Sequence, residues 1–237
     1  MTQTDDLADR LAQVRSAIDD ARAQVSGPPV RLIAVSKRHP ASRIRAAYAL
    51  GLRDFGENFA QELATKRDAL ADLPDLRWHF LGRIQRNKIK LLRGCAWVQT
   101  VDRIEVAEAL ARQHARDDPG APPRDILVPV NFDEPQKGGV LVDDLDALID
   151  AVRAVAGVRL RGLMVLPPRG SLEDARGHFQ HLRDLATRLR DTHALGPDFD
   201  QCSMGMSGDF VAAVHAGATM VRVGTAIFGA RPPTDKT

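Results

Sequence analysis

The sequence predicts a single (β/α)8 TIM barrel of the α/β class over residues 1–237, with an extra helix at its N-terminus. Three observations support this fold. Short apolar runs alternate with longer amphipathic segments, as in parallel strands joined by helices. The alternation occurs eight times, and 237 residues is a usual length for one such barrel. No linker-like or low-complexity stretch divides the chain. A doubly wound open sheet is the alternative arrangement of these elements.

The first element is an amphipathic helix over residues 4–25, with Leu7, Leu11, Val14 and Ile18 at helical spacing. Eight strands follow it, at residues 31–36, 53–56, 78–81, 96–100, 126–132, 160–166, 201–204 and 220–228. Helices are expected between them at 41–50, 61–71, from 87 onward, and at 103–115, 145–155, 172–193 and 208–216. Asp102 is the expected N-cap of helix 103–115, and Gly217 the expected C-cap of helix 208–216.

Composition excludes several classes of function. The net charge is +2, from 33 basic and 31 acidic residues without a basic block, so nucleic-acid binding is not indicated. The two cysteines, Cys95 and Cys202, have no metal-like spacing and indicate a reducing compartment such as the cytoplasm. The polar N-terminus is not expected to be a signal peptide, and no apolar run approaches the ~18 residues of a membrane span. Without an obvious apolar patch, a monomer is expected.

Lys37 directly follows the apolar run Leu32–Val35 and Ser36 of the first predicted strand. Active sites of such barrels lie at the carboxyl ends of the strands. A lysine that emerges there is partly desolvated, which lowers its pKa and leaves an amine able to form a Schiff base with a carbonyl. The alternative is a solvated lysine at the start of a loop. Lys37 is therefore a candidate nucleophile.

The loops after the seventh and eighth strands are candidates for binding phosphate, a position at which many barrels do so. Gly205 and Gly208 allow close approach of the backbone to a ligand, and Ser207 is the expected N-cap of the following helix. Gly224 and Thr225 supply a small polar turn after the eighth strand. A capped helix and an ordinary tight turn are the alternative interpretation.

Arg222 shares one face of the last strand with Met220 and Gly224, and this face is expected to point into the barrel. A buried arginine needs a partner, which could be Glu57 or a ligand atom that must stay an acceptor. His79, between Trp78 and Phe80, is read from its surroundings as a core histidine. No Ser–His–Asp set and no metal-binding spacing are recognisable.

Several segments resemble one family in the order in which its motifs occur. They are Ala34–Lys37, Phe55–Asn58, Trp78–Gly82, Gln85–Lys88, Gly162–Met164, Ser203–Ser207 and Val221–Gly229, and they span most of the chain. The sequence resembles the pyridoxal phosphate homeostasis protein family. The resemblance implies an alanine-racemase-like barrel that holds pyridoxal 5′-phosphate (PLP) and lacks a second domain.

The resemblance also implies roles for particular residues. Lys37 would form the Schiff base with PLP, and Ser207, Gly224 and Thr225 would bind its phosphate. Arg222 would face the pyridine nitrogen. The remaining cofactor-binding candidates, also carried over from the family, are Asn58, His79 and Met204. The implied function is to hold PLP in vitamin B6 and amino-acid homeostasis, with PLP-dependent apo-enzymes as potential recipients.

Two features favour a carrier over an enzyme. An arginine does not give up its proton, so it leaves the pyridine nitrogen unprotonated and makes the ring a weak electron sink. Racemases of this fold take an acid or base, commonly a tyrosine, from a second domain, whereas Tyr48 here lies in an early helix. A small racemase-like enzyme and a class I aldolase-like barrel are the alternatives. The loop from Asn131 to Lys137 is one residue shorter than usual for the family, which puts a role for Lys137 in doubt.

Overall fold

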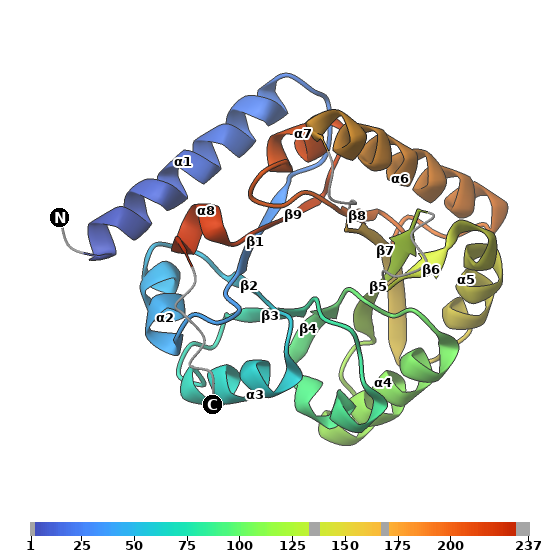
Figure 1. Cartoon of the computed structure of the whole chain (residues 1–237). Coiled ribbons are helices and arrows are strands. Elements are labelled where there is room, and N and C mark those ends of the chain that lie inside the picture. Colours follow the sequence, from blue (N-terminus) through green and yellow to red (C-terminus); the bar gives the residue numbers. More distant parts are fainter. Residues whose placement is uncertain (1–2, 133–137, 167–170, 231–237) are drawn as a thin grey trace.

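The computed structural model describes residues 3–132, 138–166 and 171–230, and they form a closed parallel β-barrel surrounded by helices (Figure 1). The sheet order is β4-β3-β2-β1-β9-β8-β7-β5-β6, and pairing of β4 with β5 closes the ring. Every pair of neighbouring strands is parallel. The predicted TIM barrel is confirmed, and the open sheet is excluded because the ring closes.

The eight barrel strands lie where the apolar runs predicted them. Their bounds are β1 Arg31–Val35, β2 Asp54–Glu57, β3 Arg77–Phe80, β4 Cys95–Val98, β5 Arg124–Asn131, β7 Val158–Val165, β8 Gln201–Ser203 and β9 Met220–Val223. A short additional strand, β6 Val140–Leu141, pairs with the end of β5. The sequence did not predict β6, since two residues are too few to produce a periodic pattern.

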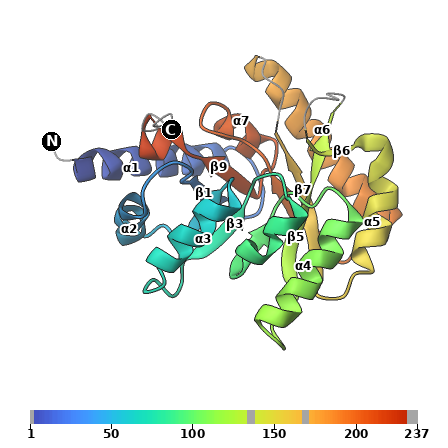
Figure 2. The same ribbon diagram turned by 60° about the horizontal axis from the view of Figure 1, so that its bottom comes forward.

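Helices cover the outside of the barrel in chain order (Figure 2). They are α2 Ala41–Ala49, α3 Ala60–Ala69, the 3-10 helix η1 Arg86–Leu92, α4 Ile104–Asp117, the 3-10 turn η2 Val142–Asp144, α5 Leu145–Arg153, α6 Leu172–Thr192, α7 Phe210–His215 and α8 Thr225–Phe228. The extra N-terminal helix, α1 Gln3–Ala23, packs against α7 and α8 and buries the predicted apolar stripe. No helix in the described part of the chain is long and apolar enough to cross a membrane.

Three local predictions were wrong. The last strand ends at Val223 rather than at residue 228, because the Gly224 carbonyl accepts hydrogen bonds from Ile227 and Phe228 and starts helix α8. Asp102 does not cap α4; Arg103 holds the N-cap position, and Asp102 forms an ion pair with it. Gly217 lies one residue beyond the C-cap of α7, with φ of 86° as expected of a glycine there.

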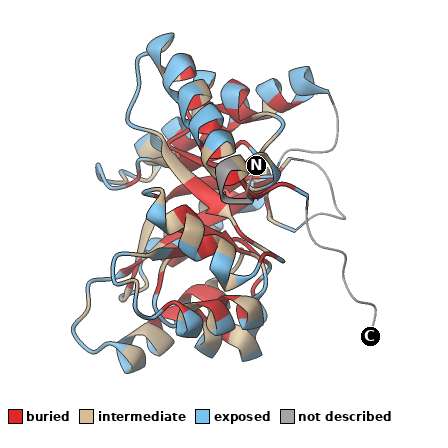
Figure 3. Ribbon diagram, turned by 90° about the vertical axis from the view of Figure 1, so that its left-hand side faces the viewer, coloured by how far each residue is buried: buried red, intermediate tan, exposed pale blue. Residues whose placement is uncertain are grey.

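Two layers of buried side chains alternate along the strands. One fills the barrel interior and consists of Ile33, Trp97, Leu127, Met164 and Met220. A larger layer lies between the barrel wall and the helices, whose buried faces turn inward and exposed faces outward (Figure 3). Met220 lies in the interior layer, whereas Val221 and Val223 lie in the outer one, so the predicted parity of β9 is confirmed. This parity directs Arg222 into the barrel.

Candidate functional site

A cavity of about 260 Å³ opens at the carboxyl ends of the strands, and we call it the cofactor cavity. Six of the eight predicted site residues line it: Lys37, Asn58, Ser207, Arg222, Gly224 and Thr225. Its other described lining residues are Val35, Leu81, Met164, Leu166, Met206 and Gly208. The structure therefore brings together residues from β1, β2, β9 and the loop after β8, which are far apart in the sequence.

A buried ionic cluster fixes the backbone on the N-terminal side of Lys37. The Ser36 hydroxyl donates to Glu57 Oε1 at 2.7 Å, and the Ser36 carbonyl accepts from Lys66 Nζ at 2.7 Å. Lys66 also lies 2.6 Å from Glu57 Oε1 and 2.7 Å from Glu62 Oε1. Glu57 is fully buried, and burial raises its pKa to about 7 against the opposing effect of Lys66. The strand end that carries Lys37 is thus held to α3.

The C-terminal side of Lys37 is held by the same helix. The Arg38 amide donates to Glu62 Oε1 at 2.5 Å, and Arg38 has a positive φ of 65°. A positive φ is uncommon for a residue other than glycine and turns the chain sharply after Lys37. Sequence reasoning missed Glu62 and Lys66, although their spacing of four residues on one helix is the signal of an ion pair.

Ser207 joins the two loops that were predicted to bind phosphate. Its hydroxyl oxygen accepts from the Gly224 amide at 3.2 Å and from the Ala226 amide at 3.3 Å. It is therefore not an N-cap as predicted: Asp209 holds that position of α7 and accepts from the Met206 amide. Gly205 has φ of 89°, and a Cβ atom there would lie 2.6 Å from the Ala213 methyl, so the loop needs glycine at this position.

Arg222 is the buried cation of the site, with only 3% of its surface exposed. Nη1 donates to Ser203 Oγ and Nη2 donates to the Val165 carbonyl, each at 2.7 Å. Burial lowers the pKa of this guanidinium to about 10. No carboxylate of the described residues forms an ion pair with it, and Glu57, one partner considered from the sequence, pairs with Lys66 instead.

The other two predicted site residues lie outside the described lining of the cavity. His79 is fully buried, stacks on Trp97 and forms hydrogen bonds with Asp54 and Gln99, in agreement with a core histidine. Met204 is fully buried in the outer layer of the core. Their roles toward a cofactor stay predictions. Lys137, whose role was in doubt, lies outside the described residues.

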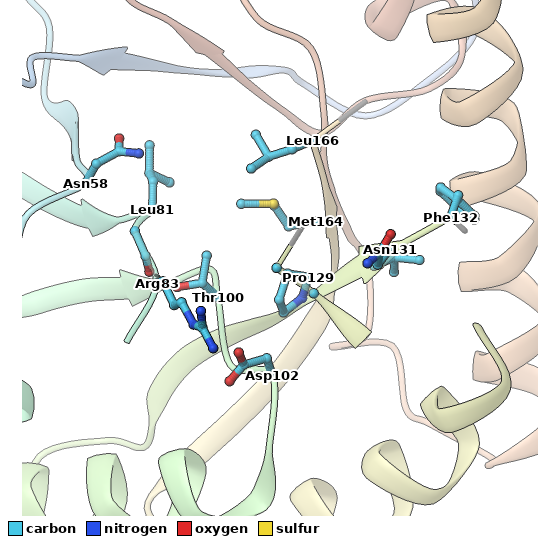
Figure 4. A pocket seen from close by; sticks show the side chains of 14 residues that line it. Asn58, Leu81, Arg83, Thr100, Asp102, Pro129, Asn131, Phe132, Met164 and Leu166 are labelled. Carbon is cyan, nitrogen blue, oxygen red and sulfur yellow. Dashed lines mark hydrogen bonds between the residues drawn. The ribbon is translucent and has the colours of Figure 1, made fainter. Parts of the chain in front are cut away.

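A second cavity of about 370 Å³ adjoins the first and shares Asn58, Leu81, Met164 and Leu166 with it. In Figure 4 the side chains of Met164, Leu166 and Leu81 lie along its upper part. Arg83 and Asp102 come from the segments after β3 and β4 and lie together at its lower edge. Arg83 is not among the residues predicted from the sequence to line the site. The two cavities therefore share one stretch of wall at the mouth of the barrel.

Comparisons with known proteins agree with this geometry. Residues 10–232 match the family model described as "Alanine racemase, N-terminal domain". The chain is 44% identical over 230 residues to a pyridoxal phosphate homeostasis protein of Pseudomonas aeruginosa, covering 95% of this chain and 96% of that protein. It is 40% identical over 237 residues to the protein of the same name in Escherichia coli K12, covering 98% of this chain and 99% of that protein.

Solved structures give the same result. PipY of Synechococcus elongatus, solved with PLP bound, superimposes with a TM-score of 0.82 at 39% identity and covers 94% of this chain and 100% of its own. Alanine racemase from Corynebacterium glutamicum superimposes with a TM-score of 0.69 at 16% identity, covering 98% of this chain and 63% of its own, and at that identity shows a shared fold alone.

Proposed function

Since the chain belongs to the pyridoxal phosphate homeostasis protein family, we propose that it holds PLP reversibly as a Schiff base on Lys37 and lacks robust catalysis. The proposal depends on one observation: Lys37, Arg222, the loop that contains Ser207 and the turn that contains Gly224 all line one cavity. Those residues supply an amine, a cation and small polar loops, which are the groups that an aldehyde, a pyridine nitrogen and a phosphate require.

Arg222 supports the fit of PLP to this cavity. The guanidinium is buried at the cavity wall and forms no ion pair with a carboxylate of the described residues, although the charge of Asp209 acts on it. An arginine has only donors, so the ligand atom that it faces must be an acceptor. A neutral pyridine nitrogen meets this requirement, whereas a protonated one does not. When bound, PLP would supply an aldehyde carbon for Lys37 and a ring that Arg222 keeps from acting as a strong electron sink.

The loops around Ser207 support the phosphate end of the proposal. Ser207 takes hydrogen bonds from two backbone amides, so its own hydroxyl hydrogen is left to donate toward the cavity that it lines. Gly208 also lines the cavity, and a Cβ atom there would meet no atom within 4 Å, so the backbone is open to a ligand. Thr225 adds a second hydroxyl to the same part of the wall.

The same cavity favours binding over catalysis. Among its described lining residues, Lys37 and Arg222 are the only ionisable groups, so no carboxylate, histidine or tyrosine is positioned there as a second acid or base. Tyr48 lies on α2, exposed, with its hydroxyl bonded to Asp75. We infer a role in vitamin B6 and amino-acid homeostasis, with PLP-dependent apo-enzymes as recipients and the chain acting as a monomer in the cytoplasm.

The absorbance spectrum of the purified chain tests the proposal. Addition of PLP should produce a visible band that Lys37→Ala abolishes, whereas Lys90→Ala, which alters an exposed lysine outside the lining, should retain the band. Absence of a visible band after incubation with PLP would contradict the proposal. An aldolase-like lysine would form a sugar imine without visible absorbance, and a racemase would convert an amino acid faster than free PLP does.

A further inference from the structure

A chain of buried hydrogen bonds crosses the barrel interior from Arg222 to Asp54, and we call it the interior relay. Arg222 Nη1 lies 2.7 Å from Ser203 Oγ, which lies 2.6 Å from Gln99 Oε1. Gln99 Nε2 lies 3.0 Å from His79 Nδ1, and His79 Nε2 lies 2.9 Å from Asp54 Oδ1. The three middle residues are fully buried. Five side chains from β2, β3, β8, β9 and the end of β4 therefore form one connected path.

In every hydrogen bond of the relay, the donor is the residue on the Arg222 side and the acceptor is the residue on the Asp54 side. The Ser203 hydroxyl gives its hydrogen to the Gln99 carbonyl oxygen, so its own oxygen accepts from Arg222. The Gln99 amide nitrogen then faces His79, and it also lies 3.5 Å from the sulfur of Met220. His79 accepts at Nδ1 and donates from Nε2 to the Asp54 carboxylate. Each donor and acceptor in the path is used once, without conflict.

If the hydrogen bonds of the relay donated in the opposite direction, the Asp54 carboxylate would face a ring nitrogen that carries no hydrogen. If the Gln99 oxygen faced His79, the ring would have to donate from Nδ1, and a neutral ring would then present a bare Nε2 to a carboxylate. Burial lowers the pKa of His79, so the ring stays neutral. Burial opposes the charge of Asp54, but hydrogen bonds from His79 and Arg77 outweigh it and hold the pKa of that carboxyl below its usual range. Neither group can take the extra proton that the reversed relay would need.

The relay places a row of aligned dipoles behind the buried cation, and the charge of Asp209 also favours the protonated guanidinium and opposes the lowering of its pKa by burial. A carboxylate beside Arg222 would compete with a ligand for the guanidinium, whereas aligned dipoles that end on Asp54 stabilise the positive charge without occupying the cavity wall. Ser203 and the Val165 carbonyl also hold two nitrogens of Arg222 in fixed positions. The orientation of the guanidinium is thereby set before a ligand binds.

We infer that Ser203, Gln99 and His79 are positioning residues that act on the cofactor cavity through Arg222. None of the three is among the described residues that line the cavity. His79, which the family resemblance placed beside the cofactor, acts three hydrogen bonds behind Arg222. This inference rests on the proposed function and extends it, since it states which buried residues hold Arg222 ready to meet a neutral ring nitrogen.

Ser203→Ala removes the first link and leaves Arg222 Nη1 without its acceptor. The expected result is a dissociation constant for PLP on the order of tenfold higher, because a hydrogen bond to a charged group is lost, together with a shifted visible absorbance maximum. Gln99→Leu breaks the relay one link further away and should act in the same direction. Thr219→Val is the matched control: Thr219 is buried and bonds to the Cys202 amide at 2.8 Å, outside the relay.

Thr219→Val should lower the melting temperature but leave PLP affinity and the spectrum unchanged. The decisive measurement is a double-mutant cycle with Arg222→Gln, in which PLP affinity is measured in four folded chains. If Ser203 acts through Arg222, then Ser203→Ala has no further effect once Arg222 is replaced. Where Ser203→Ala does not fold, as judged by circular dichroism, the same cycle with Gln99→Leu decides the question.

The inference would be overturned if Ser203→Ala weakened PLP binding equally in the wild type and in Arg222→Gln. It would also be overturned if Thr219→Val weakened PLP binding as much as Ser203→Ala does. The wild-type chain separates this failure from failure of the proposed function. A wild-type chain that shows no visible band with PLP contradicts the proposed function. A wild-type band combined with an additive cycle contradicts the relay alone.

Discussion

Lys66 Nζ on α3 lies 2.6 Å from Glu57 Oε1 at the end of β2, and the same nitrogen donates to the carbonyl of Ser36, the residue before Lys37. Both side chains are buried, and Glu57 Oε2 has no hydrogen-bond partner among the described residues. Ser36 and Glu62 complete the cluster. Replacing a buried ion pair as a whole can be neutral, but removal of one partner leaves an uncompensated group. The loss of Lys66 and the titration of the buried Glu57 therefore each lead to a prediction.

Lys66→Met should destabilise the chain by about 3 kcal/mol or more, because Glu57 and Glu62 lose their shared cation while Glu57 stays buried. Urea denaturation followed by circular dichroism measures the free energy of unfolding. Arg45→Met is a suitable control, since the Arg45–Asp72 pair is exposed and its loss should have a much smaller effect. Equal effects of the two substitutions would show that burial does not decide the contribution of the Lys66 pair.

The raised pKa of Glu57 gives a pH dependence of stability. With a folded pKa of about 7, raised mainly by burial, Glu57 binds a proton more tightly in the folded than in the unfolded chain. Its contribution to stability is therefore fully present below the unfolded value of about 4.3 and is lost as pH rises toward 7. Glu57→Gln removes this loss, so the stability of the wild type relative to the variant should fall between pH 5 and 7. A constant difference across that range would contradict the assignment.

Two glycines of the loop after β8 should respond differently to alanine. Gly205→Ala introduces a methyl 2.6 Å from that of Ala213 at a φ of 89°, and should cost about 1–3 kcal/mol. At Gly208 the added methyl meets nothing within 4 Å, so the melting temperature should hardly change. PLP affinity should instead fall in Gly208→Ala, since Gly208 lines the cofactor cavity. Equal melting temperatures for the two variants would contradict the close approach at Gly205.

The interior relay fixes the tautomer of His79. Nε2 should carry the proton and Nδ1 should accept from Gln99, and the ring should be neutral at neutral pH because burial lowers its pKa. Nitrogen-15 chemical shifts of selectively labelled histidine distinguish the two tautomers and the charged form. A spectrum with the proton on Nδ1, or of an imidazolium at neutral pH, would contradict the direction assigned to the relay.

Much of the architecture could be predicted because barrel strands produce strong local patterns. Apolar runs located all eight strands, and the alternation along β9 placed Arg222 inside the barrel. The active end of the barrel followed from fold geometry, so Lys37 and Ser207 could be selected from their positions after strands. Helix caps were less predictable, since they depend on contacts between distant parts of the chain. Ser207, for example, was predicted to cap a helix but accepts a hydrogen bond from Gly224, 17 residues away along the chain.

The buried polar residues that surround the site without lining the cofactor cavity could not be predicted from the sequence. Lys66 and Glu57 belong to different elements, and Asp54, Gln99 and Ser203 look individually like ordinary polar residues at strand ends. Their contacts depend on which strands are neighbours and on how the strands are staggered in the closed ring, neither of which a local pattern contains. For Met204, the place in a family motif predicts a cofactor contact, which stays a prediction, and the structure places its side chain in the outer layer of the core.

The central claim, that Lys37 carries the cofactor, is tested most directly by chemical mapping. The chain incubated with PLP is reduced with borohydride, digested and analysed by mass spectrometry. The predicted result is a single phosphopyridoxyl modification on the peptide that contains Lys37, absent from Lys37→Ala and retained in Arg222→Gln at saturating PLP. A modification found instead on surface lysines such as Lys88 and Lys90, or none above the level of a denatured control, would contradict the account.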